Sequence, residues 1–297
     1  MTRELTSQLR SVVTSISGIV GLAARNLGTG EEVHINSGLV FPLASTFKVP
    51  LLLELLRLAE LGSVDLGARF SLSPEARVFG SGVLKELDPG LQPTVRDLAV
   101  LMIILSDNWA TDMLANVVGL DNVNRTLRVH GIEEVNVVLN CTQILARAAG
   151  IVSDNPSAEE LELARQRLEA AELPPDSPAL SEGSDNNVAT PRGFASLLTM
   201  LAERRYVSPW VCEQALDIMK RQQLRQRIPL LLPLRVKVAN KTGTLGPVRN
   251  DAGIIFGARA TVALAVFTKK VADPIAADRV IADCAHLLFE AWAGYEA

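Results

Sequence analysis

The chain has 297 residues, of which 48% are hydrophobic and 21% charged, values that are ordinary for a globular protein with a sizeable core. Its net charge of −4, with no basic stripe, argues against nucleic acid or an anionic membrane surface as the main partner. No stretch is long and apolar enough to predict a membrane span.

The N-terminal residues 4–16 predict a folded helix. Glu4 and several hydroxyl residues interrupt the apolar stretch that a secretory leader requires. As written, the chain carries no export signal and is expected in the cytoplasm, whereas earlier removal of a leader would leave the periplasm or the extracellular space open. Two strands at 18–26 and 32–36 follow, and they predict a hairpin that turns at 27–30.

The middle of the chain is predicted to be mostly helical. A run that is apolar at nearly every position predicts a core helix from about 46 to 61. Further helices are predicted at 94–106, 108–118, 121–130, 191–203 and 208–221. A stretch at 157–171, rich in Glu, Leu, Arg and Ala, is typical of a solvated surface helix.

The C-terminal part returns to strands, at 236–239, 251–257 and 261–268, and closes with an amphipathic helix at 274–293. Strands at both chain ends predict an α+β fold, in which one antiparallel sheet built from both termini is flanked by helices and carries an inserted all-helical region. We expect residues 1–40 and 225–297 to form the sheet domain and 41–224 the mostly helical one, with the active site between them.

The cysteines and histidines are scattered along the chain and show no metal-ligand spacing. They are Cys141, Cys212, Cys284, His34, His130 and His286. The cysteines are expected to be small buried hydrophobes, and no metal or organic cofactor is predicted. A Ser-His-Asp triad is poorly supported, although sequence distance alone leaves one open.

Ser45 and Lys48 stand one helical turn apart at the start of the predicted core helix, so they share a face. The apolar surroundings would desolvate Lys48, lower its pKa and let it accept a proton. The helix N-terminus also favours negative charge on the serine oxygen. An N-cap serine followed by a surface lysine would give the same pattern, so the pair alone leaves both interpretations open.

Two further polar segments interrupt regular structure. Ser106-Asp107-Asn108 ends a strongly apolar helical run, which fits a loop facing a cleft or a plain helix end. The segment 241–244, Lys-Thr-Gly-Thr, directly follows a predicted strand, and its glycine would let a ligand approach the backbone closely. A strand that simply ends in a turn is the alternative.

Together, Ser-x-x-Lys, Ser-Asp-Asn and Lys-Thr-Gly occur in the order that is typical of class A β-lactamases and penicillin-binding proteins. Segment 41–48 is similar to the class A nucleophile segment throughout, and 80–87 and 190–192 are similar to recurring segments of that family. The likeness spans roughly 15–140 and 188–295. The chain therefore resembles the penicillin-recognising serine hydrolases, and among them the class A β-lactamases.

The resemblance implies a role for each matching residue. Ser45 would attack a lactam carbonyl and form an acyl-enzyme, with Lys48 helping to activate it. Ser106 would relay a proton to the leaving nitrogen, supported by Lys241. The remaining implied roles are substrate binding by Asn108, Thr242, Gly243, Thr244 and Arg249, and an oxyanion hole formed by the N–H groups of Ser45 and Thr244. Asp107 is expected to be structural.

One family feature is missing. Class A enzymes carry a glutamate that activates the deacylating water, but the matching stretch 139–143 (Leu-Asn-Cys-Thr-Gln) holds no carboxylate. Ser45 and Ser106 are 61 residues apart, whereas Ser106 and Lys241 are 135 apart, which fits an insertion near 150–183. Deacylation is therefore expected to be slow, or to use a carboxylate of the inserted segment such as Glu182.

These residues predict a serine β-lactamase-type hydrolase that is acylated at Ser45 and opens the lactam amide. The alternatives are a penicillin-binding peptidase or an esterase on the same fold, and a receptor that β-lactams acylate without turnover. The expected partner is a small molecule, a β-lactam or an ester. The sequence leaves the preferred substrate and the oligomeric state open.

Overall fold

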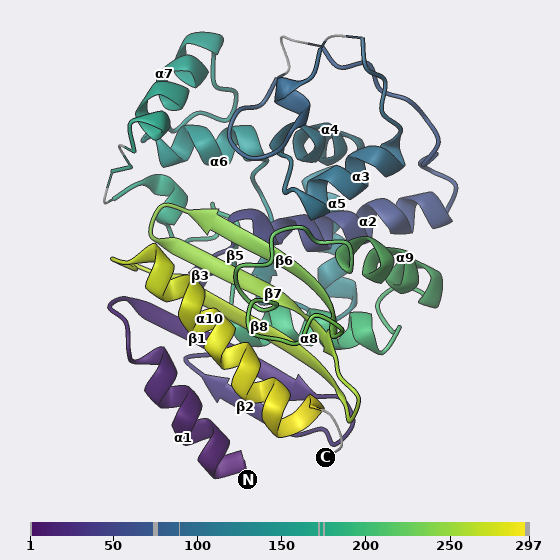
Figure 1. The fold of residues 1–297 in the computed structure, drawn as a ribbon. Coiled ribbons are helices and arrows are strands. Elements are labelled where there is room, and N and C mark those ends of the chain that lie inside the picture. The colour runs from purple at the N-terminus through teal and green to yellow at the C-terminus, as the bar shows by residue number, and fades with distance from the viewer. Residues whose placement is uncertain (1, 74–76, 89, 172, 175, 295–297) are drawn as a thin grey trace.

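The computed structural model of the chain describes residues 2–294 apart from 74–76, 89, 172 and 175. At its centre is a five-stranded antiparallel sheet in the order β2-β1-β8-β7-β6 (Figure 1). The strands are β1 (Ile19–Asn26), β2 (Glu32–Ile35), β6 (Lys237–Leu245), β7 (Val248–Phe256) and β8 (Thr261–Lys269). Because β1 pairs with β8, both ends of the chain build one sheet, as predicted.

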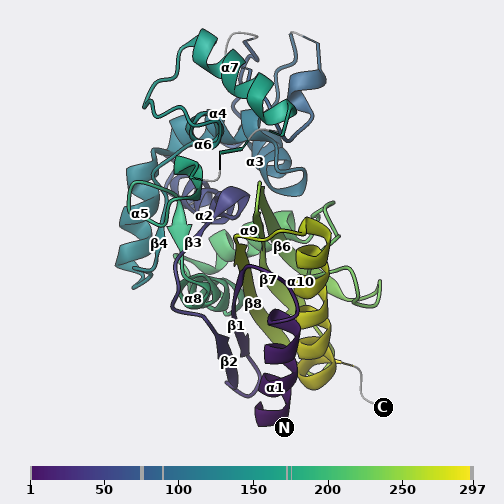
Figure 2. The same ribbon diagram turned by 90° about the vertical axis from the view of Figure 1, so that its left-hand side faces the viewer.

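Helices cover both faces of this sheet. α1 (Thr2–Val13) and α10 (Pro274–Leu288), which continues into a π-helical turn at Phe289–Ala293, lie on one face, and α8 (Pro191–Ala202) lies on the other (Figure 2). The central strands have nearly continuous apolar sequences because both faces of the sheet are buried, as β7 illustrates. Ile254 joins the hydrophobic core on the α8 side, whereas its neighbour Ile255 joins the core under α10.

The helical region lies beyond the β6 edge of the sheet (Figure 1). Its helices are α2 (Lys48–Glu60), α3 (Val95–Ile104), α4 (Asn108–Val118), α5 (Leu120–Val129), α6 (Cys141–Ala148), α7 (Ala158–Glu169) and α9 (Pro209–Met219). α2 is buried at every position from Lys48 to Leu56, which confirms the predicted core helix. The α+β fold class is thus confirmed, while the domain boundaries stay a prediction.

Short elements connect the two regions. A second sheet consists of β3 (Phe41–Pro42), β5 (Val188–Ala189) and β4 (Val135–Asn136), in that order. The 3-10 turns are η1 (Ala44–Phe47), η3 (Leu84–Glu86) and η4 (Pro178–Leu180). Within the described residues, no helix has the length and apolar character needed to cross a bilayer.

Two predicted boundaries were wrong, and one helix was missed. The strand predicted to end at 239 continues to Leu245, because β6 keeps pairing with β7 along residues too polar to look like a strand. The helix predicted from 46 begins instead as η1, and the α-helix starts at Lys48. α6 was not predicted at all, although Asn140 and Gln143 form a complete capping box at its start.

Candidate active site

Ser45 lies in η1, between β3 and α2, at the point where the sheet meets the helical region. The preceding residue, Ala44, has φ of 44°, a left-handed conformation that costs a non-glycine residue free energy and is typical of functional sites. Lys48 is the first residue of α2 and is fully buried. The structure therefore brings the predicted nucleophile and its lysine to the start of one buried helix.

The Lys48 ammonium is surrounded by acceptors from the Ser106 loop. Its Nζ donates to the Ser106 carbonyl oxygen at 2.8 Å, to Asn108 Oδ1 at 2.9 Å and to Ser106 Oγ at 3.2 Å. Burial lowers the pKa of Lys48, and the neighbouring side chains of Cys141, Asp112 and Asp107 oppose that shift. A lysine with a lowered pKa is the group expected to accept a proton here.

Lys241 reaches the same serine from β6. Its Nζ donates to Ser106 Oγ at 3.0 Å and to the Thr242 carbonyl oxygen at 2.8 Å. Burial, followed by the positive charge of Lys48, holds the pKa of Lys241 well below its usual range. Both lysines thus donate to one hydroxyl oxygen, which leaves the Ser106 proton free to be donated elsewhere.

The Ser106 loop is held by Asp107. One carboxylate oxygen accepts the Ala110 N–H at 2.9 Å and caps α4, and the other accepts the N–H groups of Val83 and Leu84 at 2.7 and 2.9 Å. Asp107 thereby fixes the distance between α4 and the 80–87 segment, in keeping with the structural role predicted for it.

Asn108 connects this loop to the pocket wall. Its Oδ1 accepts from Lys48, while its Nδ2 donates to the Phe79 carbonyl oxygen at 3.1 Å. Ser81 Oγ also donates to Asn108 Oδ1, at 3.2 Å. The implied role of Asn108 in binding a substrate amide stays a prediction.

β6 presents its free edge to η1. The carbonyls of Asn240 and Thr242 accept from side chains outside the sheet, Gln222 Nε2 and Lys241 Nζ. Because the direction of backbone groups repeats every second residue, the Thr244 N–H points to that same free edge, toward the pocket. This is the direction that an oxyanion donor requires.

Gly243 explains how β6 approaches η1 so closely. A Cβ atom at this position would lie 2.7 Å from the Leu43 carbonyl oxygen and 3.2 Å from the Thr46 side chain. The sequence predicts that this glycine lets a ligand approach the backbone. Among the described residues, its close neighbours are instead protein atoms of Leu43 and Thr46. Thr242 and Thr244, on either side of it, line the pocket.

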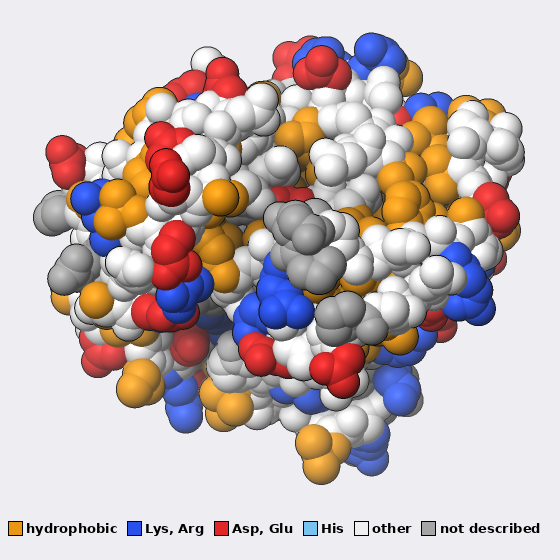
Figure 3. All heavy atoms as spheres, turned by 90° about the horizontal axis from the view of Figure 1, so that it is seen from above, with side chains coloured by type: hydrophobic (Ala, Val, Ile, Leu, Met, Phe, Trp, Pro, Cys, Tyr) orange, Lys and Arg blue, Asp and Glu red, His pale blue; other side chains and the backbone are white. Residues whose placement is uncertain are grey.

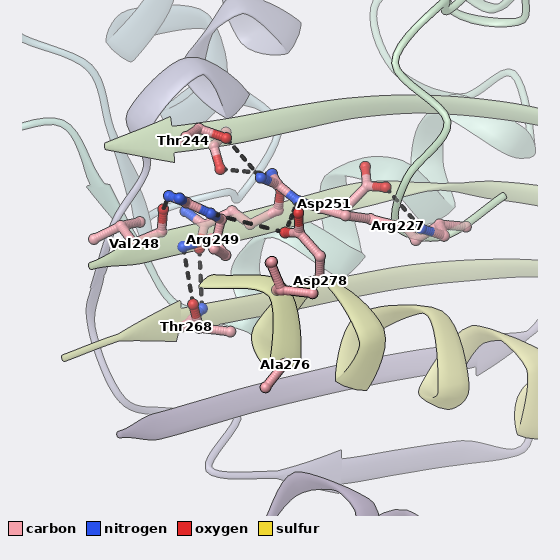
Figure 4. A network of polar contacts seen from close by, with 12 residues as sticks. Arg227, Thr244, Val248, Arg249, Asp251, Thr268, Ala276 and Asp278 are labelled. Atoms are coloured by element: carbon pink, nitrogen blue, oxygen red, sulfur yellow. Dashed lines mark hydrogen bonds and ion pairs between the residues drawn. The ribbon is translucent and has the colours of Figure 1, made fainter. Parts of the chain in front are cut away.

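Sequence reasoning missed Arg227, a fully buried side chain beneath the end of β6 (Figure 4). Its guanidinium donates to the Gly243 carbonyl at 2.8 Å, to the Asn250 carbonyl at 2.6 Å and to Thr244 Oγ1 at 2.6 Å. It also forms an ion pair of 2.6 Å with Asp278. The segment 221–235 contains several arginines and no regular period, so nothing in the sequence distinguishes this one.

The predicted Arg249 belongs to the same network but is directed away from Thr244 (Figure 4). Its Nη1 donates to the carbonyls of Gly246 and Val248, and its Nε lies 3.9 Å from Asp278. Burial and the nearby charge of Arg227 lower its pKa. Arg227 therefore holds the Thr244 hydroxyl directly, whereas Arg249 bonds to the backbone of the β6–β7 turn.

The residues around Ser45, the Ser106 loop, β6 and α6 line a pocket of about 290 Å³. Its polar lining includes Ser45, Ser106, Asn108, Thr242 and Thr244, and much of the rest is apolar, including Ile144, Leu145 and Leu245. None of the described residues that line the pocket is an aspartate or a glutamate. No group of three His, Cys, Asp or Glu side chains in the described part of the chain is arranged to hold a metal ion.

Cys141 occupies the part of the pocket next to Lys48. The residue is the first of α6, and its backbone N–H donates to Asp112 Oδ1 at 2.6 Å. Burial raises the pKa of its thiol to about 12, although the charge of Lys48 opposes the shift. The group is therefore a neutral thiol near pH 7, and it is a poor general base.

Glu182 does not supply the missing carboxylate. It forms an ion pair of 2.7 Å with Lys269 and lines a different cavity, beside Pro178 and Pro247. The expectation that Glu182 acts as the base is therefore wrong for this arrangement, because its carboxylate is engaged outside the Ser45 pocket. Glu172 of the same inserted segment lies outside the described residues.

Comparison with known proteins adds to this geometry. The sequence model of the β-lactamase enzyme family matches residues 4–292. A β-lactamase from Sphaerobacter thermophilus DSM 20745 is 30% identical, covers 96% of each chain and has a TM-score of 0.79. PBP-A is 24% identical, covers 97% of this chain and 95% of its own, and has a TM-score of 0.77, a likeness of fold alone. The β-lactamase regulatory protein BlaB from Streptomyces cacaoi is 27% identical, with 85% of each chain covered.

Proposed function

The chain belongs to the β-lactamase enzyme family, and from that premise we propose that β-lactams acylate it at Ser45 and that the acyl group leaves slowly. One observation carries the proposal. Ser45, Ser106 and their two lysines converge at one pocket, but a neutral thiol stands where a water-activating carboxylate would be needed. The site thus offers the groups for forming an acyl-enzyme and lacks one for destroying it quickly.

Acylation begins when the Ser45 hydroxyl attacks the lactam carbonyl carbon. The new bond joins Ser45 Oγ to that carbon, and the hydroxyl proton passes to the Lys48 amine, whose lowered pKa lets it accept. Negative charge develops on the carbonyl oxygen. The Thr244 N–H, with that of Ser45, would stabilise this charge by about 3 kcal/mol per donor.

The lactam C–N bond then breaks, and its nitrogen needs a proton. Ser106 is suited to deliver one, because both lysines donate to its oxygen and leave its hydrogen available. The proton that Lys48 gained can replace the one that Ser106 gives, so no net proton is consumed. The products of this step are an ester at Ser45 and a free amine in the opened ring.

Substrate binding would rely on the β6 side of the pocket. β-Lactams carry a carboxylate beside the ring nitrogen, and Thr242 and Thr244 line the pocket there. Arg227 donates to Thr244 Oγ1, so that hydroxyl can direct its own hydrogen to the substrate. We assign Arg227 as the residue that orients Thr244, and Arg249 as a more distant positive charge.

Incubation with benzylpenicillin, followed by intact mass over time, tests the proposal. We expect a lasting mass increase of one penicillin, absent in Ser45→Ala, while opened lactam accumulates slowly. Rapid product release from mostly unmodified protein would overturn slow deacylation. If neither adduct nor product formed, acylation by β-lactams would be refuted and ester hydrolysis would be tested next.

A second candidate is a β-lactam receptor, in which the lasting acyl group is itself the signal. The neutral thiol beside Lys48 favours it, and so does the relative named a β-lactamase regulatory protein. Deacylation that takes many hours would support this reading over a slow hydrolase. A change in partner binding after acylation would be needed to establish it.

A further inference from the structure

A second cavity, larger than the Ser45 pocket, adjoins it. This groove has a volume of about 780 Å³ and shares Gly80 and Leu145 with the pocket. One of its walls is segment 77–86, and the other is α7 of the inserted segment. Figure 3 looks down on this side of the molecule, where acidic, basic and hydrophobic side chains gather over α7 and the region facing it.

The spacing of side chains on α7 shows that one helix face is directed into the groove. Ala158, Leu161, Arg165 and Leu168 recur at intervals of three and four residues, and all of them line it. The opposite side of the helix is anchored by the fully buried Ala164 and by Arg167, whose Nη1 donates to the Ala149 carbonyl at 2.8 Å. Leu161 and Leu168 remain partly exposed in the groove and belong to neither hydrophobic core.

The groove lies on the side of the pocket where the acyl substituent of a bound substrate is expected. Thr242 and Thr244 lie on β6, where the carboxylate next to the lactam nitrogen would bind. Gly80 and Asn108 lie on the other side, where the acyl substituent of a substrate would leave the pocket. A Cβ atom on Gly80, whose φ is 88°, would lie 2.8 Å from Asn108 Nδ2, so only glycine lets segment 77–86 pack this closely against Asn108 where the pocket and the groove meet.

Charge decides what the far end of the groove would accept. On α7, Arg165 forms ion pairs of 2.6 Å with both Glu162 and Glu169, and across the groove Lys85 pairs with Glu86. Arg77 forms no close ion pair with a carboxylate of the described residues, although its charge helps to lower the pKa of Glu86 after the hydrogen bond and charge of Lys85, and its guanidinium lies 5.9 Å from the centre of the Trp109 ring. It is therefore the groove cation that an incoming anion can pair with at the lowest cost.

Resting on the proposed acylation at Ser45, we infer that this groove is a specificity subsite for a long acyl substituent. The substituent has an aliphatic stem, which lies along Leu161 and Leu168, and a terminal carboxylate, which pairs with Arg77. Substrates with short or purely neutral acyl groups would fill the Ser45 pocket and leave the groove to water.

The test compares two penicillins that differ only at the end of the side chain, adipoyl with a terminal carboxylate and hexanoyl with a methyl group. Binding is measured calorimetrically on Ser45→Ala protein, so that no acylation occurs. We expect the adipoyl compound to bind about fivefold more tightly, the factor for an exposed ion pair of ~1 kcal/mol. Arg77→Gln should abolish that preference.

Lys85→Gln is the matched control, because it removes a cation of the same groove that is already paired, and it should keep the preference. Leu161→Asp tests the stem and should weaken binding of both compounds. Equal affinities for the two penicillins, or a preference that survives Arg77→Gln, would refute the inference. The intact mass of the unchanged protein, measured after incubation with the hexanoyl compound, reports acylation of Ser45 separately. A failure of the proposed function is therefore distinguished from a failure of the subsite.

Discussion

The two sides of the Ser45 pocket differ in their capacity to move protons. On one side, Lys241 of β6 and Lys48 at the start of α2 both donate to Ser106 Oγ, at 3.0 and 3.2 Å. On the α6 side, the only described titratable side chain lining the pocket is the Cys141 thiol, whose pKa burial raises to about 12. On the proposed function, acylation would depend on the two lysines and Ser106 and deacylation on the α6 side, so we expect that either reaction can be changed without the other.

The largest effect is expected from Lys48→Met. Loss of the proton acceptor should slow acylation by benzylpenicillin by about 10³-fold, within the usual range for a general base. The free energy of unfolding should stay the same or rise, because an apolar side chain replaces a buried amine. Stopped-flow or mass kinetics and thermal melting give the two readouts, and Lys237→Met, on the exposed side of β6, is the control. Unchanged acylation would remove Lys48 from the mechanism.

Cys141→Glu is expected to give the next largest effect, on the other side of the pocket. A carboxylate beside Lys48 could take a proton from water, so release of the penicilloyl group should accelerate by about 10²-fold. Acylation should change little. The lifetime of the acyl-enzyme is the measurement, and Cys141→Ala, which removes the thiol without adding a base, should leave it long. Equal lifetimes in all three proteins would show that a base at this position does not limit deacylation.

Arg227→Lys is expected to have a moderate effect. Lysine cannot hold Gly243, Asn250 and Thr244 together, because its ammonium lacks the planar fork of donors. We expect about tenfold weaker capture of benzylpenicillin and a lower melting temperature. Arg225→Lys, two residues away and exposed, should behave as the unchanged chain. Full activity with lowered stability would restrict Arg227 to a structural role.

The smallest effect concerns pH. Burial lowers the pKa of Lys48 and Lys241, so each loses its proton below the usual lysine value of ~10.4. The rate of Ser45 acylation, which requires the neutral Lys48 amine, should therefore rise with pH and level off below that value. Between the lowered pKa values of the two lysines in the folded chain and their usual value, the unfolded chain binds more protons than the folded one. The free energy of unfolding therefore also rises with pH in that range. A rate that falls as the solution becomes more alkaline would mean that a protonated lysine is the active form.

Much of this site could be predicted from local sequence. Ser45 and Lys48 share one helical turn, and Ser106, Asp107 and Asn108 interrupt an apolar helix, so their proximity within each motif follows from short-range geometry. The order of the three motifs then gave the family resemblance, and the family match confirmed that resemblance. The strand was predicted to end too early, at 239, because the polar residues 241–244 lack the apolar alternation that marks a strand.

Other features required the folded chain. Arg227 reaches Thr244 only because the chain passes beneath the end of β6, and nothing local separates it from the neighbouring exposed Arg225. Nothing in the sequence marks Glu182 as engaged, yet folding directs it to Lys269. A titratable residue gains its role from partners that are distant along the chain, and one sequence does not reveal those partners.

The sequence by itself determined the motif residues, the sheet made from both chain ends and the absence of a carboxylate at 139–143, since each depends on residue identity or short-range periodicity. Tertiary structure alone decided that two lysines share one serine oxygen, that a buried thiol lies beside one of them, and that α7 forms a groove next to the pocket. The reason is physical: burial and long-range contacts set pKa values and cavity shape, and both arise only when distant segments pack together.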